Sequence, residues 1–139
     1  MKYVCLVYLV EREMSAMSKR EADACVEESL AYDQALRRSG HLIVANALQP
    51  VEAATTVRVR NGKLLATDGP FAETKEQLGG FILIEARDLN DAIQVAARIP
   101  LARAGSIEVR PIKELRFRER DIPGNVRKAD GNWPGVPAE

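Results

Sequence analysis

Two stretches of the chain, residues 3–10 and residues 81–86, are almost continuously apolar, and each predicts a buried β-strand. Because successive side chains of a strand point to opposite faces, such stretches need cover on both sides. A further strand is predicted at residues 41–48, where Pro50 ends it. Residues 106–110 alternate between apolar and charged side chains, which is typical of a strand with one buried face.

The pattern between these strands predicts two helices, at residues 18–39 and residues 89–99. The first begins with Ser18 and Glu21, the S-x-x-E pair of a capping box that satisfies two backbone amides. Gly40 follows it as a left-handed cap. The second helix follows an aspartate that can cap it, and its apolar residues recur at helical spacing.

A β-hairpin is predicted in the middle of the chain. Residues 56–60 alternate, with valines on one face and arginines on the other. Asn61 and Gly62 form the strongest short hairpin signal, and residues 63–67 supply the second arm. A loop over residues 68–80 leads from this hairpin to the next strand.

The order strand, helix, strand, hairpin, strand, helix, strand predicts an α+β, ferredoxin-like fold with an antiparallel sheet. Right-handed crossovers place both helices on one face of that sheet. The opposite face then has no cover, although residues 3–10 and 81–86 are apolar on both sides. A second copy of the same sheet is the simplest cover, so we expect a homodimer with a pocket at the rim of the sheet.

Composition excludes several classes of function. The 139 residues suit a single domain, and 20 basic against 20 acidic residues give no general attraction to nucleic acids or anionic membranes. Without a long apolar run or a signal-peptide pattern, we expect a cytoplasmic protein with no membrane partner. Cys5, Cys25 and a single histidine form no metal-binding pattern, and there is no glycine-rich nucleotide loop. We therefore expect no metal and no cofactor.

The densest polar stretch reads DGPFAETKE and begins at Asp68. A tight turn alone explains its first three residues, because aspartate, glycine and proline each favour turn geometry. Alternatively, the turn directs Asp68, Glu73, Lys75 and Glu76 into a cleft, where a carboxylate and an ammonium bind a polar ligand or exchange a proton. A solvated ion pair is the third alternative. Composition alone leaves all three open.

His41 is the single histidine and stands at the start of a predicted strand. Because histidine is the usual general base in proteins, His41 is a candidate catalytic residue, and Asp68 is a second one. The alternative for His41 is a partly exposed residue of a helix-to-strand turn. Ser29 and Ser106 have no His/Asp partner at an informative spacing, so the sequence does not predict a nucleophilic triad.

Four segments of the chain resemble a known family. DGPFAETKEQLGGF at residues 68–81 is the most specific, and the others are MKYVCLVY, LQPVEAATTVRVRNGKLLATDGPF and GSIEVRPI. Together they resemble a DGPF-domain protein of the YCII-related superfamily over residues 1–112. The resemblance implies a ferredoxin-like fold of the dimeric α/β barrel type. It leaves residues 113–139 as a C-terminal tail that we expect to be partly irregular.

The resemblance also has functional implications. YCII-like relatives are discussed as possible enzymes with a His–Asp pair. The resemblance places the His position near Ser29 and the Asp position near Ile99, where neither acid–base group is present. The matching motif implies these ligand-binding residues: Asp68, Phe71, Glu73 and Lys75. One implied function is a homodimeric small-molecule-binding domain or enzyme with a cleft near the DGPF loop and His41. The other is a non-catalytic interaction module associated with sigma-factor-type transcription regulation.

Overall fold

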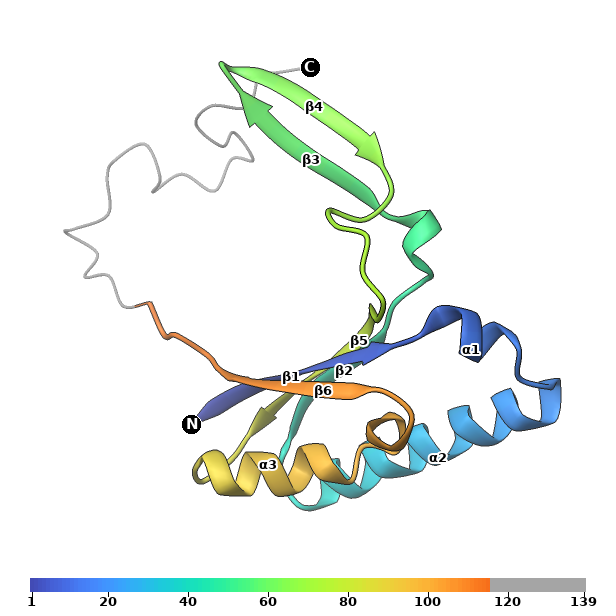
Figure 1. Cartoon of the computed structure of the whole chain (residues 1–139). Helices are drawn as coiled ribbons and strands as arrows, with labels where there is room; N and C mark the ends of the chain where they lie inside the picture. Colours follow the sequence, from blue (N-terminus) through green and yellow to red (C-terminus); the bar gives the residue numbers. More distant parts are fainter. Residues whose placement is uncertain (116–139) are drawn as a thin grey trace. The chain divides into compact units, whose positions relative to one another are not determined.

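The computed structural model describes residues 1–115 and contains a four-stranded and a two-stranded sheet (Figure 1). In chain order the strands and α-helices are β1 (Lys2–Leu9), α1 (Glu11–Ser15), α2 (Lys19–Arg38), β2 (Leu42–Ala47), β3 (Thr55–Arg60), β4 (Lys63–Asp68), β5 (Gln77–Glu85), α3 (Leu89–Ala97) and β6 (Ser106–Pro111). Two short 3₁₀ helices, η1 (Val51–Ala53) and η2 (Pro100–Arg103), lie between them. Most of the expected C-terminal tail, residues 116–139, lies outside the described residues. No helix within residues 1–115 has the length and apolar character of a membrane span.

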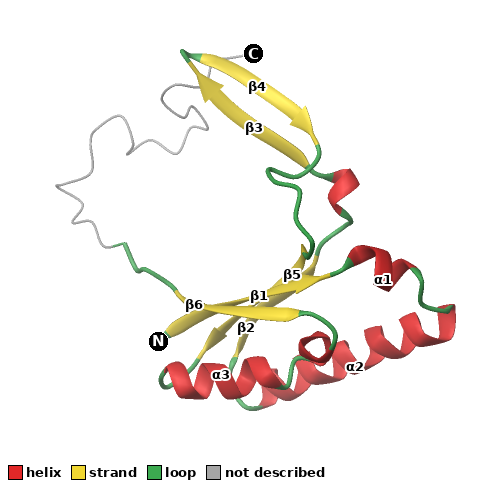
Figure 2. Cartoon of the chain, in the orientation of Figure 1, coloured by secondary structure: helices red, strands yellow, loops and turns green. Residues whose placement is uncertain are grey.

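The four-stranded sheet has the strand order β2-β5-β1-β6, and every neighbouring pair is antiparallel. This is the order of a ferredoxin-like fold, with the β3–β4 hairpin inserted between its second and third strands. Helices α2 and α3 both lie against one face of this sheet (Figure 2). The predicted fold class is therefore confirmed, including the additional hairpin.

The core lies between the two helices and this inner face of the sheet. Alternate residues of β1 and β5 point into it: Tyr3, Cys5, Val7, Ile82 and Ile84. The helices contribute Leu36, Ala92, Val95 and Ala96. Tyr32 of α2 donates its hydroxyl hydrogen to the carbonyl oxygen of Val95 at 2.6 Å, which ties α2 to α3. Burial raises the pKa of Cys5 to about 11, so this thiol stays protonated and unreactive near neutral pH.

The other side chains of β1 and β5 point to the outer face of the sheet. In the β1–β5 register, Val4 lies opposite Leu83 and Leu6 lies opposite Phe81. All four are half-buried. Helices α2 and α3 cover only the inner face, so within residues 1–115 the two central strands present apolar side chains on a face without helices.

Local signals fix the ends of several elements as predicted. Ser18 Oγ accepts a hydrogen bond from the N–H of Glu21 at 3.2 Å, which begins α2. Gly40 has φ +80° just beyond α2. Asn61 and Gly62 have φ +52° and +73°, which is the backbone that a two-residue hairpin turn requires.

The structure corrects the expected loop over residues 68–80. Asp68 is the last residue of β4 and Gln77 is the first of β5, so the connection is shorter at both ends. Gly80 is paired within β5, and a Cβ at this position would lie 2.9 Å from the carbonyl oxygen of Asn46. Glycine therefore serves here for close strand approach and not for a turn. Helix α1 was not predicted, and α3 ends slightly earlier than expected.

The tip of the hairpin, residues 57–65, belongs to a second compact unit of the chain. Its exposed apolar side chains are Val57, Val59, Leu64 and Leu65. Val57 and Val59 alternate with Arg58 and Arg60, as predicted, whereas Leu64 and Leu65 are adjacent. A two-stranded hairpin alone is only marginally stable in water.

Candidate functional site

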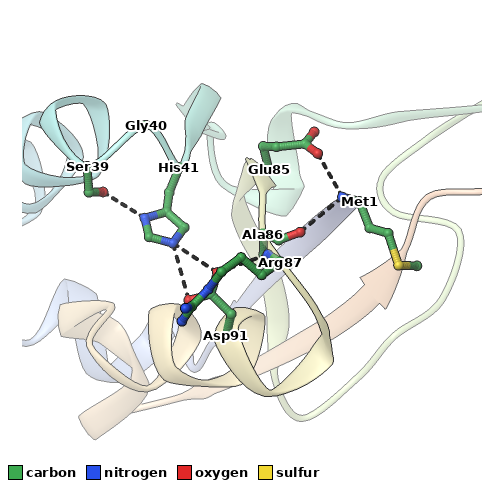
Figure 3. Close-up of a pocket in the computed structure, with 8 residues that line it drawn as sticks. All are labelled: Met1, Ser39, Gly40, His41, Glu85, Ala86, Arg87 and Asp91. Carbon is green, nitrogen blue, oxygen red and sulfur yellow. Dashed lines mark hydrogen bonds and ion pairs between the residues drawn. The ribbon is translucent and has the colours of Figure 1, made fainter.

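His41 lies between the end of α2 and the start of β2 (Figure 3). Gly40, with φ +80°, turns the chain so that the N–H of His41 donates to the carbonyl oxygen of Leu36 at 2.9 Å. The carbonyl oxygen of His41 accepts from the N–H of Glu85, the last residue of β5, at 2.8 Å. The backbone of His41 is therefore fixed to both α2 and the sheet, which sets the direction of its imidazole ring.

Both ring nitrogens of His41 have partners. Nε2 lies 3.2 and 3.3 Å from the two carboxylate oxygens of Asp91, and Nδ1 lies 2.7 Å from Ser39 Oγ. The side chain of His41 is 24% exposed and that of Asp91 is 11% exposed, so the pair is partly shielded from water. We call the Ser39–His41–Asp91 chain of hydrogen bonds the relay.

Asp91 is held in the first turn of α3. Its N–H donates to the N-cap Asp88 at 2.8 Å, and its carboxylate accepts from the N–H of Arg87 at 3.0 Å. This backbone hydrogen bond, and then that from His41, hold the pKa of Asp91 below its usual range despite the opposing effect of desolvation. Asp91 is therefore a carboxylate near neutral pH and accepts the hydrogen of Nε2–H.

The hydroxyl of Ser39 has one hydrogen and two acceptors within reach. His41 Nδ1 is 2.7 Å away and the carbonyl oxygen of Leu36 is 3.0 Å away. When His41 is neutral, with its hydrogen on Nε2, Ser39 donates to Nδ1. When His41 is protonated, Nδ1–H donates to Ser39 Oγ and the hydroxyl hydrogen turns to Leu36. The relay thus stays hydrogen-bonded in both protonation states, as a proton-transfer group requires.

The relay lines a pocket of about 430 Å³. The remaining lining residues include Met1, Glu85 and Arg87 (Figure 3). The amino group of Met1 lies 2.7 Å from Glu85 Oε1 and lowers the pKa of that carboxyl. Arg87 Nε lies 3.5 Å from Asp91 Oδ2. The pocket has the size of a site for a small molecule, and the charged groups that line it are paired with one another.

The DGPF motif forms the turn that follows β4. Gly69 has φ +104°; its N–H donates to the carbonyl oxygen of Ala54 at 2.7 Å, and its own carbonyl accepts from Thr56 Oγ1 at 2.9 Å. Phe71 beside it is 81% exposed. Within residues 1–115, no ion pair involves a charged group of residues 68–76. Hydrogen bonds between Gly69 and residues 54 and 56 therefore hold the turn without an ion pair.

The structure separates residues that the sequence had placed in one cleft. His41 contacts the last residue of β5, whereas Lys75 lines a second pocket together with Gln77, the first residue of β5. The nine residues of this strand span about 27 Å. Three of the expected ligand-binding residues line neither pocket: Asp68, Phe71 and Glu73. Glu76 instead accepts a hydrogen bond from Ser106 Oγ at 3.1 Å.

Sequence reasoning identified His41 but missed its partners. Asp91 lies 50 residues away from His41, and helix capping already explains an acidic residue at its position. Ser39 is an ordinary residue for the end of a helix, and nothing in its spacing distinguishes it. Ser29 and Ile99 take no part in the relay. Only the fold brings the three groups together.

Comparison with known proteins gives the family. The YCII-related domain matches residues 1–116. An uncharacterised protein of Rhizobium meliloti (strain 1021) is 40% identical over 114 residues, which are 81% of this chain and 92% of that protein. The match covers every strand and helix described above, including those that carry the relay. The chain therefore belongs to the YCII-related domain family.

Proposed function

We propose that this protein is an enzyme that transfers a proton to and from a small molecule through the relay. The hydrogen bonding of His41 carries the proposal. Asp91 fixes the hydrogen of the neutral ring on Nε2, so Nδ1 is the base, and Nδ1 faces the hydroxyl of Ser39. Asp91 also stabilises the imidazolium that forms when His41 takes up a proton, which is the role of the carboxylate in a His–Asp pair.

The proposed step transfers one proton, in net terms, from the substrate to His41 by way of the Ser39 hydroxyl, and only bonds to hydrogen form and break. A weakly acidic group of the substrate donates its hydrogen to Ser39 Oγ. The hydroxyl proton of Ser39 passes to Nδ1 of His41 while the substrate proton passes to Ser39 Oγ. The products are a substrate anion, an intact Ser39 hydroxyl and an imidazolium paired with Asp91. The reverse transfer returns the proton to the same or another atom of the substrate.

The pocket supports a small, polar substrate. Its volume of about 430 Å³ lies within the usual range of small-molecule sites. Arg87 lines the pocket, and its Nε lies 3.5 Å from Asp91 Oδ2. Its guanidinium supplies a positive charge next to the developing anion, and such a charge stabilises the transition state of proton removal.

Base-catalysed ring opening of 5-nitrobenzisoxazole tests the proposal, because removal of a single proton releases a coloured phenolate. His41→Gly should lower the rate about 100-fold, the usual contribution of a general base, and added imidazole should restore part of it. Lys75→Gln, at the other end of β5, is the matched control and should keep the wild-type rate. A folded His41→Gly protein that is as fast as the wild type would refute the relay.

The same proposal includes a homodimer formed through the outer face of the sheet. Its support is the apolar set of Val4, Leu6, Phe81 and Leu83, because an isologous contact would cover this face on both copies. Leu83→Asp should then give monomers in light scattering. Leu30→Asp is the control, since Leu30 is 57% exposed on α2. Equal dimer content in both variants would argue against this interface.

A second function, that of a non-catalytic interaction module linked to sigma-factor-type regulation, is favoured by one observation. Phe71 of the DGPF turn is 81% exposed, and exposed aromatic residues are enriched at protein interfaces. Calorimetric titration with a purified extracytoplasmic-function sigma factor tests this function. Binding that Phe71→Ser abolishes and His41→Gly preserves would support the interaction module over the enzyme.

Membership of the DGPF subgroup and a cytoplasmic location belong to the same proposal. The motif at residues 68–71 supports the subgroup. Cys5 and Cys25 are both free thiols, and Cys5 is buried, which is the usual state of cysteines in a reducing compartment. When the protein is unfolded without a reductant, a thiol-specific reagent should label both cysteines. This result checks that neither cysteine is oxidised.

A further inference from the structure

A second pocket, of about 450 Å³, lies at the opposite end of β5 from the relay. Three segments far apart in the sequence form it: residues 10–12 after β1, Val51, and, around the start of β5, Thr74, Lys75 and Gln77. The proposed proton transfer uses none of these residues. The pocket therefore needs an explanation of its own.

Hydrogen bonds to backbone atoms hold the walls of this pocket together. Glu11 Oε1 accepts from the N–H of Val51 at 2.9 Å. Gln77 Oε1 accepts from the N–H of Glu11 at 3.0 Å, and Gln77 Nε2 donates to the carbonyl oxygen of Thr74 at 2.6 Å. These contacts join all three segments, so the side chains of Glu11 and Gln77 are occupied in positioning the backbone.

Arg12 and Lys75 are the two cations of the pocket. Within residues 1–115 neither has an ion pair or a side-chain hydrogen bond, whereas Arg103 binds Glu28 at 2.8 Å and Arg110 binds Glu108 at 2.6 Å. With the carboxylate of Glu11, whose Oε1 already accepts a hydrogen bond, the pocket carries one net positive charge. Within residues 1–115 these two cations therefore remain available to a ligand.

We propose that this pocket binds the phosphate group of a small molecule. The guanidinium of Arg12 offers a planar fork of N–H donors that matches phosphate oxygens, and Lys75 adds a second point charge. Two cations match a dianionic phosphate better than a single carboxylate, which needs only one. The rigid walls reduce the loss of conformational freedom on binding, because only the two cationic side chains must become ordered.

Inorganic phosphate is the probe, titrated into isotope-labelled full-length protein at constant ionic strength and followed by backbone amide NMR signals. We expect saturable shifts confined to residues 10–12, 51 and 74–77. Arg12→Gln and Lys75→Gln should each weaken binding about tenfold, the usual effect of losing one charge-assisted hydrogen bond. The affinity of the wild-type protein for acetate should be no higher than the affinity of either single variant for phosphate.

Arg103→Gln is the matched control, because it removes a cation that already has an acidic partner. It should leave phosphate binding unchanged, as should His41→Gly, so this experiment fails or succeeds independently of the proton relay. Shifts that never saturate, shifts spread over the whole surface, or equal weakening by Arg103→Gln would overturn the phosphate site. The mapping on the wild-type protein keeps the test decisive even where a variant does not fold.

Discussion

The two ends of β5 use their polar side chains in opposite ways. At the end near Glu85, each charged group in the pocket has a partner: His41 and Arg87 contact Asp91, and the amino group of Met1 contacts Glu85. At the other end Arg12 and Lys75 have no partner within residues 1–115. Paired groups control where a proton sits, whereas unpaired cations attract an anion.

This difference follows from the elements that form each end. The relay is built from the C-terminus of α2 and the first turn of α3, both of which pack on the core, so its side chains have fixed neighbours. The second pocket is built from the start of α1, Val51 and the residues around the start of β5, and its fixed side chains, Glu11 and Gln77, hold backbone atoms. We infer that the first end is suited to chemistry and the second to binding.

The strongest way to break the comparison is to remove the carboxylate of the relay. Asp91→Ala leaves the ring nitrogen Nε2 and the N–H of Arg87 without their acceptor. The rate of 5-nitrobenzisoxazole opening should fall about 100-fold, since the imidazolium loses its counter-charge. Phosphate binding, measured in the same preparation, should not change. A parallel loss of both properties would show that the two ends are not independent.

Two glycines with positive φ sharpen the comparison with a smaller effect. Gly40 and Gly69 have φ +80° and +104°, and an added Cβ would meet no atom within 4 Å at either position. Alanine at either site should therefore destabilise the protein by about 1 kcal/mol through backbone strain alone, as thermal unfolding would show. Only Gly40→Ala should also slow proton transfer, because Gly40 directs His41 toward Asp91. Unchanged melting by both variants would contradict the turn geometry.

The smallest expected effect is the change in the free energy of unfolding as the solution becomes acidic. The pKa of Asp91 is lowered in the folded protein, first by the N–H of Arg87 and then by His41. Such a carboxyl stabilises the fold above its unfolded pKa, and this contribution is lost as the pH falls through the lower, folded value. Below about pH 4, the free energy of unfolding should therefore fall more steeply for the wild type than for Asp91→Asn. The pKa of Glu85 is also lowered, so part of the slope should remain in that variant. Identical slopes in urea unfolding would contradict this role of Asp91.

Much of the fold could be predicted because its signals are local. Ser18, Gly40 and the Asn61-Gly62 pair each act on their immediate neighbours. The two buried strands are predicted by their almost continuous apolar sequence. Gly80 was misassigned to a loop because glycine usually interrupts strands, and only the close approach of Asn46 explains it. The candidate sites depend on contacts between distant segments. Tertiary packing alone decides that Asp91 meets His41 and that Arg12 lines the same pocket as Lys75.

Titration of the imidazole nitrogens by ¹⁵N NMR tests the relay most directly. The chain has a single histidine, so the two ring signals belong to His41 without ambiguity. The account predicts that Nε2 keeps its hydrogen throughout and that Nδ1 alone changes from an unprotonated to a protonated nitrogen as the pH falls. In Asp91→Ala this preference should weaken. A wild-type spectrum in which Nε2 is the nitrogen that takes up the proton would contradict the proposed relay.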